Sequence, residues 1–297
     1  NLEINVARYC KAKYCVAVSS ASAALHLSVM SLGFKKPFYG LTSPNTFVAT
    51  TNAIIHSGGK VDLIDICRNN YNLSVKKFEE YVSKKIKNKQ ALPKLVIPVH
   101  FAGLSVDMKK LKKICSTHSI KIIEDASQAM GGKYENVLIG NCKYSDLTVF
   151  SMHPVKSITS GEGGLILTNK KTIYNKLLKL RINGVNKNST KSWENDVSEI
   201  GFNYKISEIN CALANSQLKR LNQFIRYRKN IANQYKRKLN KNIFRFQEQD
   251  SNSSSSFHLF IIEFKQTISG KKKDIFYKRL KKKGIFLDVK YRPIQFF

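Results

Sequence analysis

Short apolar runs alternate with segments of helical periodicity along most of the chain. The run from Tyr14 to Ser20 predicts a strand, and a segment from about Ser22 to Leu32 with apolar residues at helical spacing follows it at once. Further strands are predicted by KVDLIDI, LVIPVH, IKIIEDAS, DLTVFSM and LILTN, and a crossover helix by VDMKKLKKICSTH. This alternation predicts an α/β protein with a mostly parallel central sheet and helices on both faces.

The pattern changes in the last third of the chain. We expect a long helical region from about Ile206 to Leu239, and a low-complexity break at the serine-rich stretch from Ser251 to Ser256. FHLFIIEF, a basic helix and GIFLDV follow the break and look like the start of a small α+β domain. We therefore expect a large domain over residues 1–220, and a connecting helix with a partial small domain over residues 221–297. Because the chain begins without Met and stops inside that small domain, we expect a fragment of a longer protein.

Composition excludes several classes of protein. A chain of 297 residues with 42% hydrophobic residues can bury a sizeable core. Its six cysteines are scattered, without CxxC pairs or His-rich clusters, which argues against metal sites and against a disulfide framework. No apolar run is long enough to span a membrane, and the first residues have no signal-peptide pattern. We expect a cytoplasmic globular protein without a metal or a membrane partner.

The formal net charge is +31, from 51 Lys and Arg against 20 Asp and Glu. Such a charge suggests nucleic acid, an anionic surface or an anionic substrate as a partner. However, the lysines are spread through helical stretches, and the clusters at 271–273 and 281–283 lack the interleaved aromatic residues that would stack on bases. We interpret the charge as a solvated basic face and expect no nucleic-acid partner; a diphosphate ligand would also be attracted by it.

Two chemically informative residues follow neighbouring apolar runs. Asp125 ends one run, and Lys156 comes 31 residues later, after the run DLTVF. In open α/β sheets, ligands lie beyond the carboxyl ends of the strands. A lysine can hold an aldehyde as a Schiff base, and a carboxylate can keep a pyridine nitrogen protonated, so the pair predicts a pyridoxal phosphate site. Taken singly, Asp125 could equally serve in an ion pair or a cap, and Lys156 could be a surface residue.

Other residues near strand ends could complete this site. Ser22, in the strand-to-helix junction SSASAAL, could hold a phosphate together with free backbone N–H groups, although such a serine is commonly only a helix cap. Ser151 could place its hydroxyl on the same phosphate. Phe47 offers a plate for a flat ring, or it could be a core residue. Gln128 could bond a phenolic oxygen, although an ordinary loop contact would look the same in sequence.

The attacking lysine must be deprotonated, and burial beside another cation lowers its pKa. The SGEGG stretch (160–164) permits tight turns that would wrap the site. His153 is a second possible base. Because Lys156 can carry the proton itself once it is released from the cofactor, we interpret His153 as structural.

Several segments together resemble one family. SSASAALH, TSPNTFVATTNAI, IPVHFAG, EDASQAMGGKY, SDLTVFSMHPVKSITSGEGGLILTN and GFNYKISEINCALANSQLKRL are similar, in order, to the motifs of the DegT-type sugar-nucleotide aminotransferases. These enzymes belong to the aspartate aminotransferase superfamily, fold type I. Within the family, the chain looks most like the transaminases of pseudaminic acid biosynthesis that form UDP-4-amino-4,6-dideoxy-N-acetyl-beta-L-altrosamine.

The resemblance implies a role for each matched position. Lys156 would hold the cofactor, and Asp125 would pair with its pyridine nitrogen. The remaining contacts would be ring stacking by Phe47, phosphate binding by Ser22, the Ala23 backbone and Ser151, and a contact of Gln128 with the phenolic oxygen. Asn203 matches a residue that reaches the cofactor phosphate of the neighbouring subunit, so a homodimer is implied.

The chain departs from the family pattern at a few positions. Ala21 and Ser22 replace a commoner Gly-Thr, although Ser22 keeps the hydroxyl. Gln128 replaces a frequent His, Lys205 a frequent Arg, and Lys290 stands where His is usual. The change at Lys290 puts contacts with the sugar or the neighbouring subunit in doubt more than the cofactor site.

The resemblance implies an aminotransferase that moves an amino group from L-glutamate to a nucleotide-linked, UDP-type 4-keto-6-deoxy sugar, as in surface-glycan biosynthesis. Two alternatives stay open. Some relatives replace the lysine by histidine and dehydrate sugars, a branch that Lys156 disfavours. A noncatalytic, cofactor-binding regulator is the other, since the usual opening segment and much of the small domain are absent from this sequence.

Overall fold

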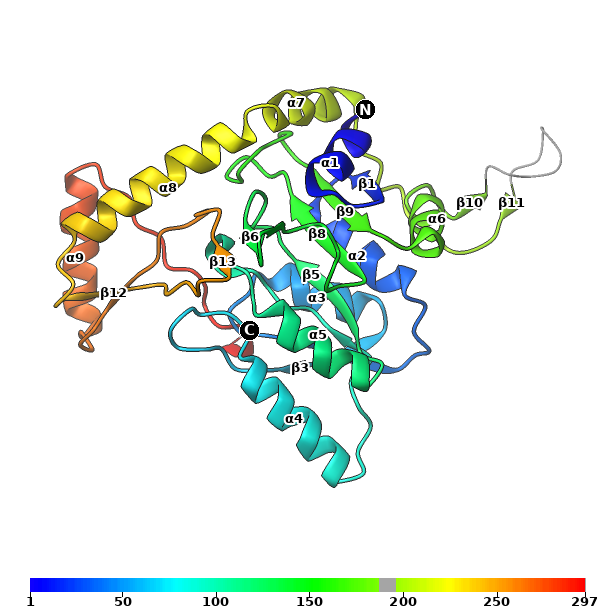
Figure 1. Cartoon of the computed structure of the whole chain (residues 1–297), viewed down its shortest axis with the longest axis horizontal. Helices are drawn as coiled ribbons and strands as arrows, with labels where there is room; N and C mark the ends of the chain where they lie inside the picture. The colour runs from blue at the N-terminus through cyan, green and yellow to red at the C-terminus, as the bar shows by residue number, and fades with distance from the viewer. Residues whose placement is uncertain (187–195, 297) are drawn as a thin grey trace.

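The chain folds around a seven-stranded sheet (Figure 1). The computed structural model describes residues 1–186 and 196–296. The strands follow the order β1-β9-β8-β5-β4-β2-β3 across the sheet, and every neighbouring pair is parallel except the two that involve β9. The expected mostly parallel α/β sheet is therefore confirmed. Its strands are β1 (Tyr14–Val18), β2 (Phe38–Thr42), β3 (Gly59–Leu63), β4 (Leu95–Val96), β5 (Lys121–Asp125), β8 (Leu147–Ser151) and β9 (Gly164–Thr168).

Helices cover both faces of the sheet (Figure 1). Side chains alternate between the two faces of a strand, so successive residues pack in different hydrophobic cores. In β8, Val149 packs in the core on one face of the sheet and Phe150 in the core on the other. The face of Val149 is covered by α2 (Ala21–Ser31), α3 (Val48–His56) and α6 (Lys171–Leu180). The opposite face is covered by α1 (Leu2–Cys10), α4 (Val75–Lys87), α5 (Met108–Thr117), α7 (Glu208–Leu218) and the start of α8 (Leu221–Lys238).

Local sequence fixes where several of these helices begin. A serine or aspartate side chain accepts the backbone N–H three residues further on, which satisfies one of the unpaired donors of the first turn. The capping residues are Ser20, Ser74, Asp107, Ser207 and Ser269. Helix α2 differs from the others because nearly all of its residues are buried. An apolar helix of this kind must lie inside the molecule. Helix α2 starts shortly after β1, at the edge of the sheet where the carboxyl end of β1 lies.

The structure departs from the predicted elements in two ways. The helical region expected from about Ile206 to Leu239 is two helices, because α7 ends at Leu218 and α8 begins at Leu221. Helices α1, α4 and α6 were not predicted at all. In α4 only Phe78 and Val82 are buried, but its apolar residues recur at helical spacing, so the signal was present in the sequence and was overlooked.

The serine-rich stretch is a structured part of the protein. Ser253–Ser254 form β13, which pairs with β6 (Lys133–Tyr134), and the next two serines are almost completely buried. Ser256 donates its backbone N–H to the Gly103 carbonyl at 3.0 Å and its hydroxyl to the Gln128 carbonyl at 3.0 Å. Small polar side chains suit this position because they satisfy backbone groups without requiring space.

The remaining elements are short or peripheral. They are the 3-10 turns η1 (Phe101–Gly103) and η2 (Ile294–Phe296), the strands β7 (Val137–Leu138), β10 (Val185–Asn186), β11 (Asp196–Val197), β12 (Phe244–Phe246) and β14 (Ile262–Phe264), and helix α9 (Gly270–Lys282). Within the two described ranges, no helix combines the length and the apolar character needed to cross a bilayer. The division into domains at residue 220 stays a prediction.

Gly164 carries a testable consequence of the sheet register. A Cβ at this position would lie 2.3 Å from the Ser20 carbonyl oxygen and 2.8 Å from the Ala21 nitrogen, both of which are backbone atoms. Since the backbone cannot yield cheaply, we expect Gly164→Ala to lower the free energy of unfolding by about 1–3 kcal/mol in urea denaturation. Gly270→Ala is the matched control, because a Cβ there meets nothing within 4 Å. Equal stabilities of the two variants would contradict the close approach of β9 and α2.

Candidate functional site

The carboxyl ends of β5 and β8 bring the predicted lysine and aspartate together. Asp125 is the last residue of β5, and it pairs with Val149 in the parallel β8. Lys156 lies in the turn that follows β8, where its backbone N–H donates to the His153 carbonyl at 2.9 Å. The Asp125 carboxylate acts electrostatically on the Lys156 amine, so the two charged groups share one site as the sequence suggested.

The Asp125 side chain is only 5% exposed, and each of its oxygens is held. The Thr50 hydroxyl donates to Oδ2 at 2.7 Å, and the Ser127 backbone N–H donates to Oδ1 at 3.1 Å. Thr50 in turn bonds the Thr46 hydroxyl at 2.7 Å. A buried carboxylate with fixed geometry and remaining lone pairs can accept a further hydrogen bond from a cationic ring nitrogen.

The loop that carries Lys156 is closed at its base. Met152 donates its N–H to the Gly163 carbonyl at 2.8 Å, and Ser160 donates to the Met152 carbonyl at 3.0 Å. Burial lowers the pKa of the Lys156 ammonium below its ordinary value; the Asp125 carboxylate opposes this shift, and Lys290 adds to it. Lys156 is therefore easier to deprotonate than a surface lysine. His153 lies apart, half exposed, with its Nε2 3.6 Å from a Glu162 carboxylate oxygen.

A buried polar network anchors the strand beneath this site. The backbone N–H of Val106 donates to Nδ1 of His100 at 3.2 Å, so Nε2 carries the proton and donates to the Glu124 carboxylate at 2.7 Å. Burial opposes the ionisation of Glu124, but hydrogen bonds from His100, Ser145 and Thr148 outweigh it and hold the Glu124 pKa below its usual value. The backbone N–H of His100 also donates to the Asp125 carbonyl at 3.0 Å. His100 thus fixes both residues at the end of β5.

The start of α2 and the end of β8 lie next to each other. Ser151 pairs with Gly164, and Gly164 lies directly against the backbone of Ser20 and the first residue of α2. Ser22 is exposed in the first turn of that helix, where a helix N-terminus attracts anions. The Ala23 N–H already donates to the Ser20 hydroxyl at 3.1 Å, so Ser20 is the helix cap. The phosphate contact of Ser22 and Ser151 stays a prediction.

Phe47 and Gln128 differ in their exposure. Phe47 is the N-cap of α3, three residues before Thr50, and is 59% exposed, so it is not a core residue. Gln128 is 5% exposed, and both ends of its amide are bonded within the protein.

Asn203 is placed differently from the other predicted residues. It is exposed and forms an isolated β-bridge with Ile182. In the part of the chain that the structure describes, no hydrogen bond or ion pair joins Asn203 to the other predicted site residues. Its proposed reach to a neighbouring subunit stays a prediction.

Distant segments add residues that sequence analysis did not place in the site. His258 and Tyr291 come from the last 40 residues, and Thr50 from the start of α3. Burial, then the positive charges of Lys156, Arg228 and Lys290, lowers the pKa of His258 to about 3, and its buried Nδ1 has no hydrogen-bond partner. No local pattern distinguishes these residues from ordinary core or surface positions, so their chemistry depends on tertiary contacts.

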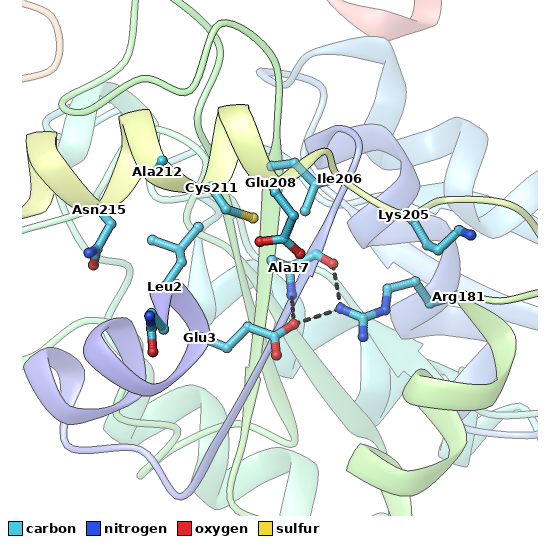
Figure 2. A pocket seen from close by; sticks show the side chains of 11 residues that line it. Leu2, Glu3, Ala17, Arg181, Lys205, Ile206, Glu208, Cys211, Ala212 and Asn215 are labelled. Carbon is cyan, nitrogen blue, oxygen red and sulfur yellow. Dashed lines mark hydrogen bonds and ion pairs between the residues drawn. The ribbon is translucent and has the colours of Figure 1, made fainter. Parts of the chain in front are cut away.

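A separate pocket of about 380 Å³ lies beside α1 and α7 (Figure 2). Part of its polar lining is paired internally: Glu3 accepts the Ala17 backbone N–H at 2.8 Å and an Arg181 N–H at 2.6 Å. None of the predicted site residues lines this pocket. Among the residues that the structure describes, no group of three or more His, Cys, Asp or Glu could hold a metal ion.

The low pKa of His258 predicts acid sensitivity. Below the ordinary histidine pKa of 6.5, the unfolded chain takes up a proton that the folded protein refuses down to about pH 3. The contribution of His258 to the free energy of unfolding is therefore fully present above pH 6.5, and it falls by about 1 kcal/mol per pH unit below that value. We expect urea denaturation at pH 7.5 and 5.5 to show a smaller loss in His258→Asn than in the unsubstituted protein. His153→Asn, at an exposed histidine, is the control; an identical loss in all three proteins would contradict this role of His258.

Several known proteins are similar to this chain in sequence and in fold. The DegT/DnrJ/EryC1/StrS aminotransferase family model matches residues 1–296. A UDP-4-amino-4,6-dideoxy-N-acetyl-beta-L-altrosamine transaminase of Campylobacter jejuni is 36% identical over 286 residues, which cover 96% of this chain and 73% of that protein.

Solved structures agree with these matches. Helicobacter pylori PseC, an aminotransferase involved in the biosynthesis of pseudoaminic acid, has a TM-score of 0.87 at 29% identity and covers 99% of this chain and 76% of its own. Bacillus subtilis NtdA with bound cofactor PMP has a TM-score of 0.82 at 27% identity and covers 98% of this chain and 63% of its own. The expected fold type is thereby confirmed, and the chain belongs to the DegT/DnrJ/EryC1/StrS aminotransferase family.

Proposed function

We propose that the chain is a pyridoxal phosphate-dependent aminotransferase that moves an amino group from L-glutamate to a UDP-linked 4-keto-6-deoxy sugar. The observation that carries the proposal is the Lys156 amine, with its lowered pKa, beside the buried Asp125 carboxylate at the ends of β8 and β5. Membership of an aminotransferase family supports the reaction class, and a relative with bound PMP supports the cofactor.

The residues present fit this cofactor. Lys156 would hold its aldehyde carbon, and Asp125 would pair with its ring nitrogen, with Phe47 against the ring face. Ser22, Ser151 and the α2 N-terminus would hold its phosphate. Bound pyridoxal phosphate supplies an electron sink for the bonds at the amino-bearing carbon. Thr50 and Ser127 keep the Asp125 oxygens in place, which fixes the position at which that carboxylate would accept the hydrogen bond.

Lys156 also supplies the proton chemistry. Since burial lowers its pKa, the amine at Nζ would take a proton from the amino-bearing carbon of the donor in the first half-reaction and release it to the cofactor before the keto acid leaves. In the second half-reaction the transfer would run in reverse, and Nζ would deliver a proton to the sugar carbon at which amination occurs. The closed base of its loop restricts where Nζ can move. The same group therefore serves both halves of a ping-pong reaction.

Charge supports a nucleotide-linked substrate. Lys156, Lys290 and Arg228 all act on His258, so three cations surround one corner of the site. Asp288 pairs with Lys290 at 2.5 Å, which leaves this corner with an excess of positive charge. A diphosphate suits such a corner, and the net charge of +31 favours the approach of anions. The names of the altrosamine transaminase and of PseC support the UDP-sugar class.

We also propose a homodimer in the cytoplasm. Large apolar side chains near Asn203 are exposed: Ile200 is 84%, Ile209 82% and Leu213 43% accessible. A second copy that covers them would bury apolar surface and bring Asn203 toward the partner's cofactor. All six cysteines are free thiols, which is consistent with a reducing compartment.

The function is tested by turnover and by trapping. The purified protein should convert a UDP-linked 4-keto-6-deoxy sugar to the amino sugar with L-glutamate, and borohydride should fix pyridoxal phosphate to it covalently. In Lys156→Ala we expect both signals to fall on the order of 1,000-fold, since the amine that would hold the aldehyde is lost. Mass spectrometry of the trapped protein and chromatography of the sugar product give the two readouts.

Lys76→Ala is the control, because its side chain is 87% exposed on α4. Unchanged trapping in Lys156→Ala would refute the assignment of the lysine. Covalent trapping without turnover, for any nucleotide-linked keto sugar, would instead favour the cofactor-binding regulator.

The dimer is tested at α7. We expect Ile209→Asp to raise the dimer dissociation constant on the order of tenfold or more, because a charge would replace a buried apolar contact. Sedimentation velocity measures the shift toward monomer. Ile86→Asp is the control, since Ile86 is 48% exposed on α4, away from Asn203. An unsubstituted protein that is monomeric at micromolar concentration would rule out the dimer.

A further inference from the structure

The orientation of the Gln128 side chain is determined by its neighbours. The backbone N–H of Ala102 lies 2.7 Å from Oε1, and a backbone N–H can only donate. The carbonyl end of the amide therefore faces Ala102, and the NH₂ end faces the opposite way. There, Nε2 donates to the Tyr291 hydroxyl at 2.7 Å.

One hydrogen of Nε2 is left over. An amide NH₂ has two donors, and Tyr291 takes only one. Among the described residues, no second acceptor lies within hydrogen-bond distance of Nε2. Gln128 is 5% exposed and three residues beyond Asp125, so this remaining donor lies in the same site as the carboxylate. A buried donor without a partner is unfavourable unless a ligand accepts it.

Two aromatic rings and a nearby backbone hydrogen bond restrict the position of Tyr291. Its ring centroid lies 6.3 Å from that of Phe47 and 6.1 Å from that of Phe101. Three residues later, the Ile294 N–H donates to the Pro44 carbonyl at 3.1 Å, which ties this segment to the loop before Phe47. Burial, followed by the negative charges of Asp125 and Asp288, raises the pKa of Tyr291 to about 12. Its hydroxyl is neutral at physiological pH and can keep accepting the Gln128 hydrogen.

A glutamine needs such support in order to act as a directed donor. Its terminal torsion is soft, and its two ends can exchange places by rotation. An amide bonded at only one end would spend much of its time in orientations that miss a ligand. Two fixed bonds, from Ala102 and to Tyr291, remove that freedom before binding, so less conformational entropy is lost when the ligand arrives.

We propose that Tyr291 is a positioning residue: its hydroxyl locks the Gln128 amide so that the second Nε2 hydrogen is presented to the phenolic oxygen of the cofactor. The inference rests on the proposed function, because it needs a pyridoxal ring between Asp125 and Phe47. Tyr291 and Gln128 are 163 positions apart in the sequence.

Tyr291→Phe removes the hydroxyl and keeps the ring. We expect the dissociation constant for pyridoxal phosphate, measured by fluorescence titration, to rise roughly 3- to 10-fold, as for the loss of one hydrogen bond. A hydrogen bond to the phenolic oxygen favours its anionic form. The pH midpoint of the bound cofactor's visible absorption should therefore move upward, on the order of half a unit, while Asp125, Lys156 and Lys290 are unchanged.

The chain offers a matched control. On the exposed surface of α8, Gln223 Nε2 donates to the Tyr227 hydroxyl at 3.3 Å, so Tyr227→Phe deletes the same kind of bond away from the site. We expect it to change neither the dissociation constant nor the midpoint. Gln128→Glu keeps an acceptor for Ala102 but has no hydrogen to present. In that background, adding Tyr291→Phe should change cofactor affinity by less than about twofold, because the pair acts as one unit.

The outcomes separate the two proposals. A normal dissociation constant and a normal midpoint in Tyr291→Phe, with an unsubstituted protein that binds the cofactor, would overturn the role of Tyr291 alone. An affinity loss of equal size with and without Gln128→Glu would also overturn it, since Tyr291 would then act independently. If the unsubstituted protein bound no pyridoxal phosphate, both the inference and the proposed function would fail.

Discussion

The parallel pairing of β5 with β8 is the constraint on which the rest of the site depends. It places Asp125 and the residues after Ser151 at one edge of the sheet, because parallel strands end on the same side. The antiparallel β9 then returns the chain and closes the base of the loop that carries Lys156. Gly164 completes the arrangement, since only a residue without Cβ allows α2 to start against β9.

Around this frame, charges are arranged unevenly. Asp125 is held by neutral donors, whereas Lys156 and Lys290 lie close enough to act on each other and on His258. Burial and mutual repulsion of cations lower the pKa of Lys156, and the single carboxylate only partly offsets this. Burial therefore makes the amine easier to deprotonate, whereas the surrounding cations suit phosphate-bearing ligands. Reactivity and ligand class have separate physical causes at one site.

The central strands could be predicted because most are short apolar runs bounded by polar residues, and their short length favours a strand over a helix. The outer helices were predicted less completely. Helix α4 was overlooked although its apolar residues recur at helical spacing, and α7 and α8 read as one helix because both have strong helical propensity across the break. The burial of Ser255 and Ser256 could not be foreseen, because serine runs have no hydrophobic signal and their partners lie elsewhere in the chain.

Sequence alone determined the fold class and the central pair of Lys156 and Asp125. Asp125 ends one apolar strand and Lys156 lies in the turn after its neighbour in the sheet, so local pattern and the rule for parallel sheets suffice to bring them together. Only the tertiary structure decided the hydrogen bond of Thr50 to Asp125, the burial of His258 Nδ1 without a partner among the described residues, and the contact of Tyr291 with Gln128. Those pairings join segments that are distant in sequence, and a side chain's partner across such a distance is set by packing rather than by local periodicity.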